Sequence, residues 1–439
     1  MRILQLTPGT GNFHCGTCLR DHTLVKALGR LGHEATMAPL YLPLVLDTED
    51  PDLIARRPMF GGINLYLQQK ARLFRSTPIW LDRLFDSRRL LRWASQHTGM
   101  TKANDLGDIT ISILRGEQGR QVKELQKMID WLVSQPRPDV VCLSNAMMVG
   151  MARQIKVQLG VPVGCTLQGE DTFVDSLPRF YRDQAWQTMA ERARDIAGFI
   201  AISNYYADLM KQRLHLPTDR VHVVHNGIML DGHDPANNPP DPPVLGYLAK
   251  LCSTKGLDTL VDAYLILKKS DRIKHLKLWI AGAMTRSEKP FVESITNRLR
   301  HAGVWHEVTI SANLERAAKM LMLRSLTVFS VPATYGESFG LYVLEALASG
   351  VPVVQPRHGA FEELLGATGG GILCDPNDAQ ALAEAIEQLL LDEPKRQTLG
   401  DEGRRNVIER FSADRMAQQV AEVYQALGSG SAEAISHDV

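Results

Sequence analysis

The sequence predicts an α/β protein built from two doubly wound domains. Short apolar strands alternate with amphipathic helices in both halves of the 439 residues, and this alternation is typical of parallel sheets covered by helices on both faces. Residues 234–243 hold five of the 22 prolines. Because proline stiffens and extends a chain, this stretch is typical of a linker between domains.

The first half begins with an apolar strand at residues 3–6, a glycine-containing loop at 9–16 and a helix in which Leu24, Leu28 and Leu31 share one face. Beyond residue 115, apolar runs of strand length recur at residues 139–143, 161–167, 198–202 and 221–224.

The second half restarts the alternation after the linker. Apolar runs of strand length lie at residues 244–248, 276–281, 308–310, 327–331 and 351–354. The last helix places Met416, Val420 and Tyr424 on one face, and the small polar residues from Gly428 onward predict a frayed end. Sheets of this kind bind ligands at the carboxyl ends of their strands, so we expect the site in a cleft between the domains.

Charge and composition exclude several classes of protein. Lys+Arg and Asp+Glu both number 49, so the formal net charge is zero and a nucleic-acid partner is not expected. The chain has no apolar run near the ~18–20 residues of a membrane helix, and its start lacks a signal peptide's features. Six cysteines are too few for a disulfide scaffold. We therefore expect a cytoplasmic protein.

The strongest chemical signal is the segment at residues 335–354, YGESFGLYVLEALASGVPVV. It follows one predicted strand and opens a helix, whose free N–H groups and positive dipole end suit a phosphate or a sugar hydroxyl. Glu337 lies in the loop, and Glu345 lies two helical turns further along the same face.

A second signal is the segment GYLAKLCSTKG at residues 246–256. Lys250 and Lys255 lie in a loop between a predicted strand and a predicted helix. Lysines provide point charges that suit a diphosphate.

Together these segments resemble the retaining glycosyltransferases of family 4, whose hallmark is Glu-x7-Glu preceded by Arg/Lys-x4-Lys-Gly. The resemblance covers nearly the whole chain and extends to Gly32-His-Glu, His225-Asn-Gly-Ile and Gly359-Ala-Phe-Glu. It implies the GT-B fold, in which two Rossmann-like domains face each other across a cleft. The N-terminal domain would bind the acceptor, and the C-terminal domain would bind the nucleotide sugar.

The resemblance also implies domain boundaries. The acceptor domain is expected at residues 1–227, a linker at 228–243 and the donor domain at 244–410. A helix at 411–428 is expected to pack back on the first domain, and residues 429–439 to form a flexible tail.

By the same resemblance, Lys250, Lys255 and Glu337 would be catalytic, the lysines by neutralising the leaving diphosphate and Glu337 by holding the donor sugar. Glu345 would hold the ribose hydroxyls. Residues near the N-terminus of the helix and in the first loop would complete the donor site, namely Ser338, Phe339, Gly340, Leu341, Gly9, Gly11 and Gly16.

The implied reaction transfers a hexosyl group, with retention at the anomeric carbon, from a nucleoside-diphosphate sugar to an acceptor hydroxyl. The donor is expected to be UDP-linked, and neither a metal nor a cofactor is expected. The acceptor would be a sugar, a lipid-linked molecule or a small molecule. The transition state would resemble an oxocarbenium ion, so catalysis rests on positioning and charge stabilisation.

Two positions depart from the family pattern. Lys250 stands where Arg is usual, which keeps the charge but loses a bidentate fork. Gln168 stands where a histidine is frequent, and an amide can bond a hydroxyl but cannot act as a base. Gln168, Glu170, Asp171 and His14 are the predicted acceptor-binding residues.

Several alternatives stay open. A sugar-nucleotide epimerase of similar fold, or a catalytically altered nucleotide-sugar binder, would share the architecture. Cys15 and Cys18, with His14 and His22 nearby, could bind a metal or cycle as a disulfide, or could simply occupy a glycine-rich loop. Residues 65–93 mix basic and aromatic side chains, which suits an anionic acceptor, the inner face of a membrane, or amphipathic helices packed on the first domain. Asp50-Pro-Asp52 is interpreted as a chance match to a metal-binding pattern.

Overall fold

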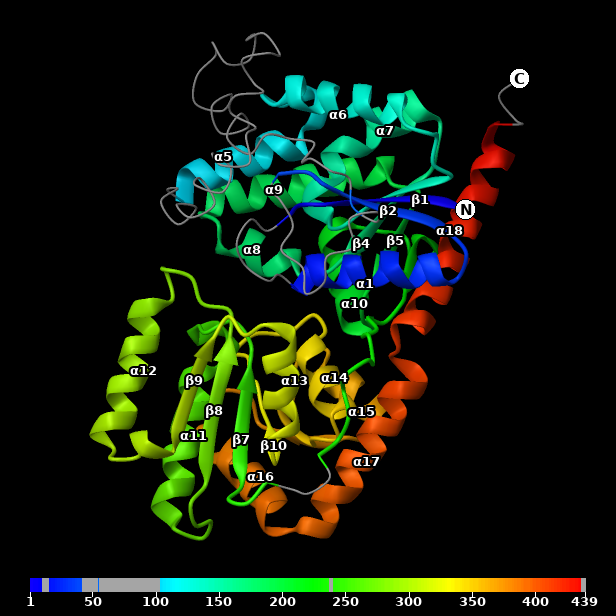
Figure 1. The fold of residues 1–439 in the computed structure, drawn as a ribbon. Coiled ribbons are helices and arrows are strands. Elements are labelled where there is room, and N and C mark those ends of the chain that lie inside the picture. The colour runs from blue at the N-terminus through cyan, green and yellow to red at the C-terminus, as the bar shows by residue number, and fades with distance from the viewer. Residues whose placement is uncertain (10–15, 42–53, 55–102, 237–239, 436–439) are drawn as a thin grey trace. The chain divides into compact units, whose positions relative to one another are not determined.

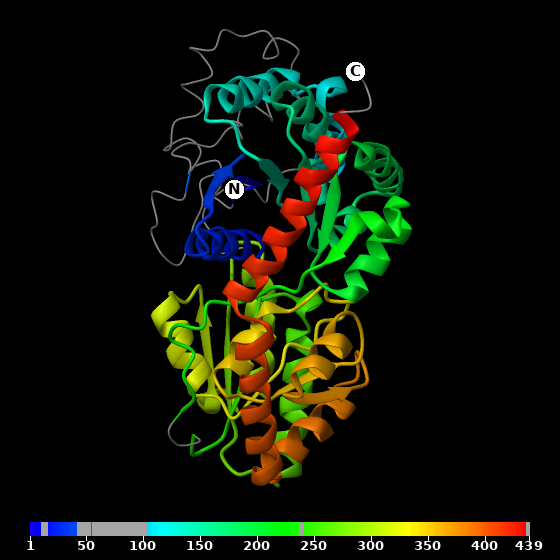
Figure 2. The same cartoon turned by 90° about the vertical axis from the view of Figure 1, so that its right-hand side faces the viewer.

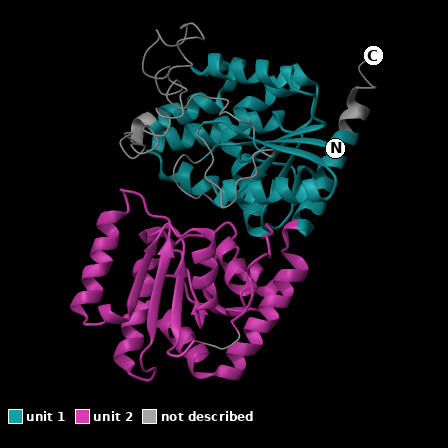
Figure 3. Ribbon diagram, viewed as in Figure 1, with its two compact units in different colours: residues 1–225, 414–439 teal, residues 226–413 magenta. Residues whose placement is uncertain are grey.

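The protein folds into two compact units (Figure 3). The structure is a computed structural model that describes residues 1–9, 16–41, 54, 103–236 and 240–435. Unit 1 comprises residues Met1–His225 and Asp414–Val439, and unit 2 comprises Asn226–Ala413. The predicted Asp-x-Asp match and the basic, aromatic stretch at 65–93 lie outside the described residues.

Unit 1 is built on a six-stranded sheet in the order β2-β1-β3-β4-β5-β6, in which neighbouring strands are parallel. The strands are β1 Arg2–Thr7, β2 Glu34–Pro39, β3 Val140–Leu143, β4 Val163–Leu167, β5 Gly198–Ala201 and β6 Val221–Val223. The residues of β3, β4 and β5 are all buried, as expected for central strands covered on both faces, whereas those of the edge strand β6 are only partly buried.

The helices of unit 1 are α1 Gly16–Arg30, α5 Ala103–Leu114, α6 Val122–Ser134, α7 Ala152–Leu159, α8 Glu170–Ser176, α9 Arg179–Arg192, α10 Asn204–Leu214 and α18 Ala413–Ile435. Short 3-10 turns are η4 Gly116–Gln118, η5 Ala146–Met151, η6 Ala193–Asp195 and η7 Thr218–Arg220. Figure 1 shows α6 and α7 on one face of the sheet and α1 on the other. Leu24 and Leu28 of α1 are buried, whereas Leu31 lies beyond the helix and is 37% exposed.

Unit 2 contains a second parallel sheet in the order β12-β11-β10-β7-β8-β9. Its strands are β7 Val244–Leu248, β8 Lys277–Gly282, β9 Val308–Ala312, β10 Val328–Phe329, β11 Val353–Pro356 and β12 Gly371–Cys374. Its helices are α11 Leu257–Ser270, α12 Lys289–His301, α13 Arg316–Arg324, α14 Leu341–Ala348, α15 Phe361–Thr368, α16 Ala379–Leu391 and α17 Glu393–Arg410, with 3-10 turns η8 Ser253–Lys255 and η9 Trp305–Glu307.

The passages of the chain from one unit to the other differ from the predicted linker and tail. The division falls at His225, so described residues of the predicted linker 228–243 belong to unit 2, where Ile228 forms a parallel bridge with Ser412. Figure 2 shows α17 followed closely by α18. The latter helix continues to Ile435, so the expected flexible tail from residue 429 is helical over most of its length.

α18 packs on the unit 1 sheet through a close fit at glycine. Leu427 lies over Gly164 and Gly198, and a Cβ atom at Gly198 would come within 2.6 Å of the Leu427 side chain. Tyr424, one helical turn earlier, is 1% exposed. Because Gly164 and Gly198 have no side chains, the helix can approach the sheet closely at these two positions.

We expect Gly198→Ala to lower the Tm by several degrees, because the added methyl group would push α18 off the sheet at a cost of about 1–3 kcal/mol. Thermal unfolding followed by circular dichroism would measure the change. Gly29→Ala in α1 is the matched control: a Cβ there meets no atom within 4 Å, so alanine should leave the Tm unchanged or raise it. Equal changes in Tm for the two substitutions would contradict the proposed close packing of α18 on Gly198.

Candidate active site

The loops that carry Lys255 and Glu337 follow neighbouring strands of unit 2. β7 and β10 pair directly, and the strand order reverses between them, since β8 and β9 continue on one side and β11 and β12 on the other. Open α/β sheets bind ligands at such a reversal, beyond the carboxyl ends of the strands. There the two loops are joined by a hydrogen bond from the Thr334 N–H to the Thr254 carbonyl, 3.0 Å long.

Gly256 permits this close approach of the loops. Its φ is 71°, and a Cβ atom here would lie 1.7 Å from the carbonyl oxygen of Pro332. Only glycine fits such a contact without displacing backbone. The position explains why the lysine segment ends in glycine.

Glu337 and Lys255 form a buried ion pair within a cage of tyrosines. The Glu337 side chain is 9% exposed and that of Lys255 is 20% exposed. Glu337 Oε2 also accepts hydrogen bonds from the hydroxyls of Tyr342, at 2.9 Å, and Tyr335, at 3.3 Å. Lys255 Nζ lies 5.0 Å and 5.8 Å from the centres of the Tyr335 and Tyr342 rings, within cation–π range.

Lys255 stays positively charged inside the cage formed by Tyr335 and Tyr342. Burial alone would lower the pKa of Lys255, but the Glu337 carboxylate and the Tyr335 hydroxyl outweigh burial and hold that pKa above its ordinary value. Burial, with the Glu337 carboxylate, raises the pKa of Tyr335 to about 12, and burial also raises the pKa of Tyr342 well above its ordinary value. Both tyrosines therefore stay protonated and donate to Glu337.

Residues 338–341 connect this cage to the start of α14. Gly340 has φ 97° and precedes the first residue of the helix, Leu341. Phe339 is 2% exposed, and the centre of its ring lies 6.3 Å from that of Phe411, with the ring planes tilted by 54°. It therefore belongs to the core, and the loop can offer a ligand its backbone at this position but not the phenyl ring.

Glu345 lies in α14 and contacts a residue that the sequence interpretation missed. Lys319 Nζ, from α13, lies 2.9 Å from Glu345 Oε1, and the two side chains are 14% and 19% exposed. Lys319 has no neighbouring motif that marks it in the sequence. Tyr335 and Tyr342 were also missed, although both lie inside the glutamate motif.

Lys250 is separated from the Lys255–Glu337 pair. Its side chain is 53% exposed and forms an ion pair with Glu288, at 3.1 Å, in the loop that precedes α12. Burial would raise the pKa of Glu288, but hydrogen bonds from Thr285 and Ser287, with Lys250, lower it to about 2. The predicted trio of catalytic residues is thus brought together only in part.

In unit 1, polar side chains gather where β1, β3 and β4 end. Asp21 of α1 is fully buried and accepts hydrogen bonds from the Ser144 hydroxyl and from Arg20, at 3.2 Å. Gln168 Nε2 donates to the Ser144 carbonyl at 2.5 Å and to Asp21 Oδ1 at 3.5 Å. Burial raises the pKa of Asp21 despite the Arg20 charge beside it. These contacts fix the amide of Gln168.

Glu170 is committed to internal hydrogen bonds. It is 5% exposed, and its two oxygens accept from the Ala146 N–H at 2.7 Å, the Gln168 N–H at 2.9 Å and the Tyr206 hydroxyl at 2.7 Å. Asp171 Oδ1 lies 2.9 Å from the same Tyr206 hydroxyl, so the two carboxyl groups share its single proton. Burial raises the pKa of both carboxyl groups. Glu170 therefore braces the loop after β4, and its predicted role as an acceptor ligand stays a prediction.

The first glycine loop is described only at its ends. Gly9 has φ 79° and Gly16 begins α1, whereas Gly11, His14 and Cys15 lie outside the described residues. Cys18 is 1% exposed, with its Sγ 3.4 Å from the Thr7 hydroxyl. Within the described ranges, no three His, Cys, Asp or Glu side chains cluster so that they could hold a metal ion.

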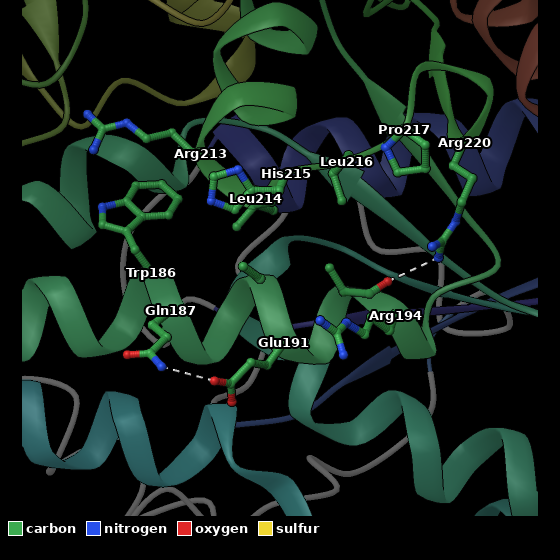
Figure 4. A pocket seen from close by; sticks show the side chains of 12 residues that line it. Trp186, Gln187, Glu191, Arg194, Arg213, Leu214, His215, Leu216, Pro217 and Arg220 are labelled. Carbon is green, nitrogen blue, oxygen red and sulfur yellow. Dashed lines mark hydrogen bonds between the residues drawn. The ribbon is translucent and has the colours of Figure 1, made fainter.

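A cavity of about 460 Å³ in unit 1 lies away from these residues (Figure 4). It is lined by α9, η6 and residues 213–220, which precede β5 and β6 and therefore lie at the amino ends of the strands. Two of its arginines have structural partners: Arg220 donates to the Ala193 carbonyl at 3.0 Å, and Arg213 pairs with Asp175 at 2.9 Å. The cavity therefore does not coincide with the candidate active site.

The fold is the GT-B fold of glycosyltransferases. Sucrose-phosphate synthase from Thermosynechococcus elongatus superimposes with a TM-score of 0.71 at 17% identity, covering 98% of this chain and 100% of that one. HepE of Anabaena, solved in complex with UDP and glucose, gives a TM-score of 0.68 at 15% identity over 97% and 100% of the two chains.

The chain belongs to glycosyltransferase family 4. Residues 109–231 match "Glycosyltransferase Family 4", and residues 232–406 match "Glycosyl transferases group 1". A D-inositol 3-phosphate glycosyltransferase of Corynebacterium aurimucosum is 30% identical over 41% of this chain and 42% of its own length. An alpha-maltose-1-phosphate synthase of Mycolicibacterium smegmatis is 30% identical over 56% and 67%. The matched part of the chain thus spans about two fifths of the length of the first relative and about two thirds of the length of the second.

In the described part of the chain, no helix is both long and apolar enough to span a membrane.

We expect Lys255→Met to destabilise the protein by about 2–4 kcal/mol, because it leaves the Glu337 carboxylate buried without its cation. Arg298→Met is the matched control, since both side chains of the Arg298–Asp262 pair are exposed, 38% and 52%, and exposed pairs contribute about 1 kcal/mol or less. Thermal unfolding of both variants at equal ionic strength would measure the difference. An unchanged Tm for Lys255→Met would show that the Lys255–Glu337 pair does not stabilise the loop that carries Glu337.

Proposed function

We propose that the protein is a retaining glycosyltransferase that moves a hexosyl group from a UDP-linked sugar to an acceptor hydroxyl without a metal ion. The observation that carries this proposal is the Lys255–Glu337 pair inside its tyrosine cage, at the strand-order reversal of unit 2 and next to the start of α14. A fixed cation and free helix N–H groups suit a diphosphate. HepE, which shares the fold, was solved with UDP.

The two oxygens of the Glu337 carboxylate can have different roles, one toward the protein and one toward the donor sugar. Every hydrogen bond that the described residues make to this carboxylate falls on Oε2. Oε1 can therefore accept a hydroxyl of the donor sugar while Oε2 keeps Lys255 in place. Lys255 would stabilise the negative charge that develops on the diphosphate as the glycosidic bond breaks.

The remaining steps rest on position and charge. The sugar would pass through an oxocarbenium-like transition state, and the acceptor hydroxyl would attack from the face that the diphosphate leaves. A diphosphate oxygen would take the hydroxyl proton, so no side-chain base is needed.

Unit 1 would bind the acceptor. Because its NH₂ group faces the Ser144 carbonyl and Asp21, the carbonyl oxygen of Gln168 would be the group that accepts a hydrogen bond from an acceptor hydroxyl. A sugar, a lipid-linked molecule or a small molecule could each provide such a hydroxyl.

We propose that the enzyme works in the cytoplasm, with residues 65–93 as a contact to the inner face of a membrane.

Binding of the donor can be tested directly by thermal shift in the presence of EDTA. UDP and UDP-glucose should raise the Tm by several degrees, because a ligand that binds only the native state stabilises it by mass action. GDP, ADP and their sugars serve as comparisons. A shift that appears only after Mg²⁺ is added would contradict metal independence, and a shift with GDP alone would contradict the assignment of UDP.

We expect Glu337→Gln to lower kcat by about 10²-fold or more while UDP binding is retained, since one charged contact to the transition state is lost. Glu409→Gln, at an exposed position in α17, is the control and should leave kcat unchanged. The anomeric configuration of the product, followed by ¹H NMR, tests retention. Inverted product, or epimerised donor without an acceptor, would contradict the proposed reaction.

A further inference from the structure

A second ion pair joins α13 to α14, two helices that lie beside each other in unit 2 (Figure 1). Lys319 of α13 and Glu345 of α14 are 2.9 Å apart, and both side chains are more than four-fifths buried. The pair joins two elements that flank β10 in sequence, because α13 precedes this strand and α14 follows it. Glu345 is therefore held from outside its own helix.

The ion pair occupies one side of the Glu345 carboxylate. Lys319 bonds Oε1, and within the described residues Oε2 accepts no hydrogen bond. His233, which is 3% exposed, lies nearby with its Nδ1 3.2 Å from the Ser349 hydroxyl. Burial lowers the pKa of His233, although the Glu345 carboxylate opposes this effect. Histidine therefore does not replace Lys319 as the cation at neutral pH.

We propose that Lys319 is a positioning residue that turns Glu345 toward the vicinal diol of a ribonucleotide. This inference rests on the proposed function, since it assigns the nucleotide of the donor to this site. A carboxylate has about four lone-pair positions. With Lys319 on Oε1, the free Oε2 and the remaining lone pair of Oε1 can accept two neighbouring hydroxyls.

The charge of Lys319 has a second consequence. An unpaired carboxylate beside a bound diphosphate would repel it, and this repulsion is strong in a partly buried site. Lys319 compensates that charge while leaving the acceptor positions of Glu345 available. A donor that lacks the 2′ and 3′ hydroxyls gains nothing from the arrangement, so the pair selects for ribose.

The test compares the affinities of UDP and 2′,3′-dideoxyuridine diphosphate by isothermal titration calorimetry. The wild-type protein should prefer UDP by about 10-fold or more, since the dideoxy analogue lacks both hydroxyls that would bond the charged carboxylate. In Lys319→Met the preference should fall to about 3-fold or less, and Lys319→Arg should restore it. With a UDP-sugar, Lys319→Met should raise KM for the donor more than it lowers kcat.

Lys268→Met is the matched control, because Lys268 and Glu307 form a pair of similar length, 2.8 Å, and similar burial elsewhere in unit 2. It should lower the Tm as much as Lys319→Met does but leave the preference for UDP unchanged. A preference that survives in Lys319→Met, or that Lys268→Met also abolishes, would overturn the positioning role while leaving the donor assignment intact. A wild-type protein that binds neither nucleotide would overturn the proposed function and this inference with it.

Discussion

The direct pairing of β7 with β10 is the constraint on which the candidate site depends. Because the strand order reverses between these two strands, the loops that follow them open side by side, and the hydrogen bond between Thr334 and Thr254 ties them together. Lys255 and Glu337, which are 82 residues apart in the chain, meet only for this reason. Their mutual burial then fixes both side chains before any ligand arrives, which reduces the reorganisation that binding would require.

The protein buries charge in both units, with different results. In unit 2 the Lys255–Glu337 pair keeps a cation beside one open carboxylate oxygen, so the charge remains available to a ligand. In unit 1 the Arg20–Asp21 pair has side chains with no exposure, and it acts through the Ser144 and Gln168 groups that it holds. A buried ion pair contributes little net stability in general, and here its value lies in orienting polar groups at the ends of the strands.

Much of the fold could be predicted from the sequence, because strands and helices follow from local hydrophobic spacing. The two glutamates and Lys255 could be found because they belong to one compact motif each. The internal bonds of Glu170 could not be predicted, since nothing in its neighbourhood in the sequence reveals that Tyr206 and the Ala146 N–H donate to it. Lys319 could not be found at all, because its partner lies 26 residues away on another helix and the contact depends on how the helices pack.

The course of the last helix bears on the order in which the protein can fold during synthesis. Unit 2 is one continuous stretch of chain, whereas unit 1 needs residues on both sides of it. The sheet of unit 1 is made of residues up to Val223. The side chain that covers Gly164 and Gly198 of this sheet, however, is that of Leu427 in the last helix. A nascent chain must therefore keep an unfinished first unit in solution while the whole second unit leaves the ribosome. The part of the sheet around Gly164 and Gly198 stays uncovered during that interval, and it is a surface that a chaperone would meet.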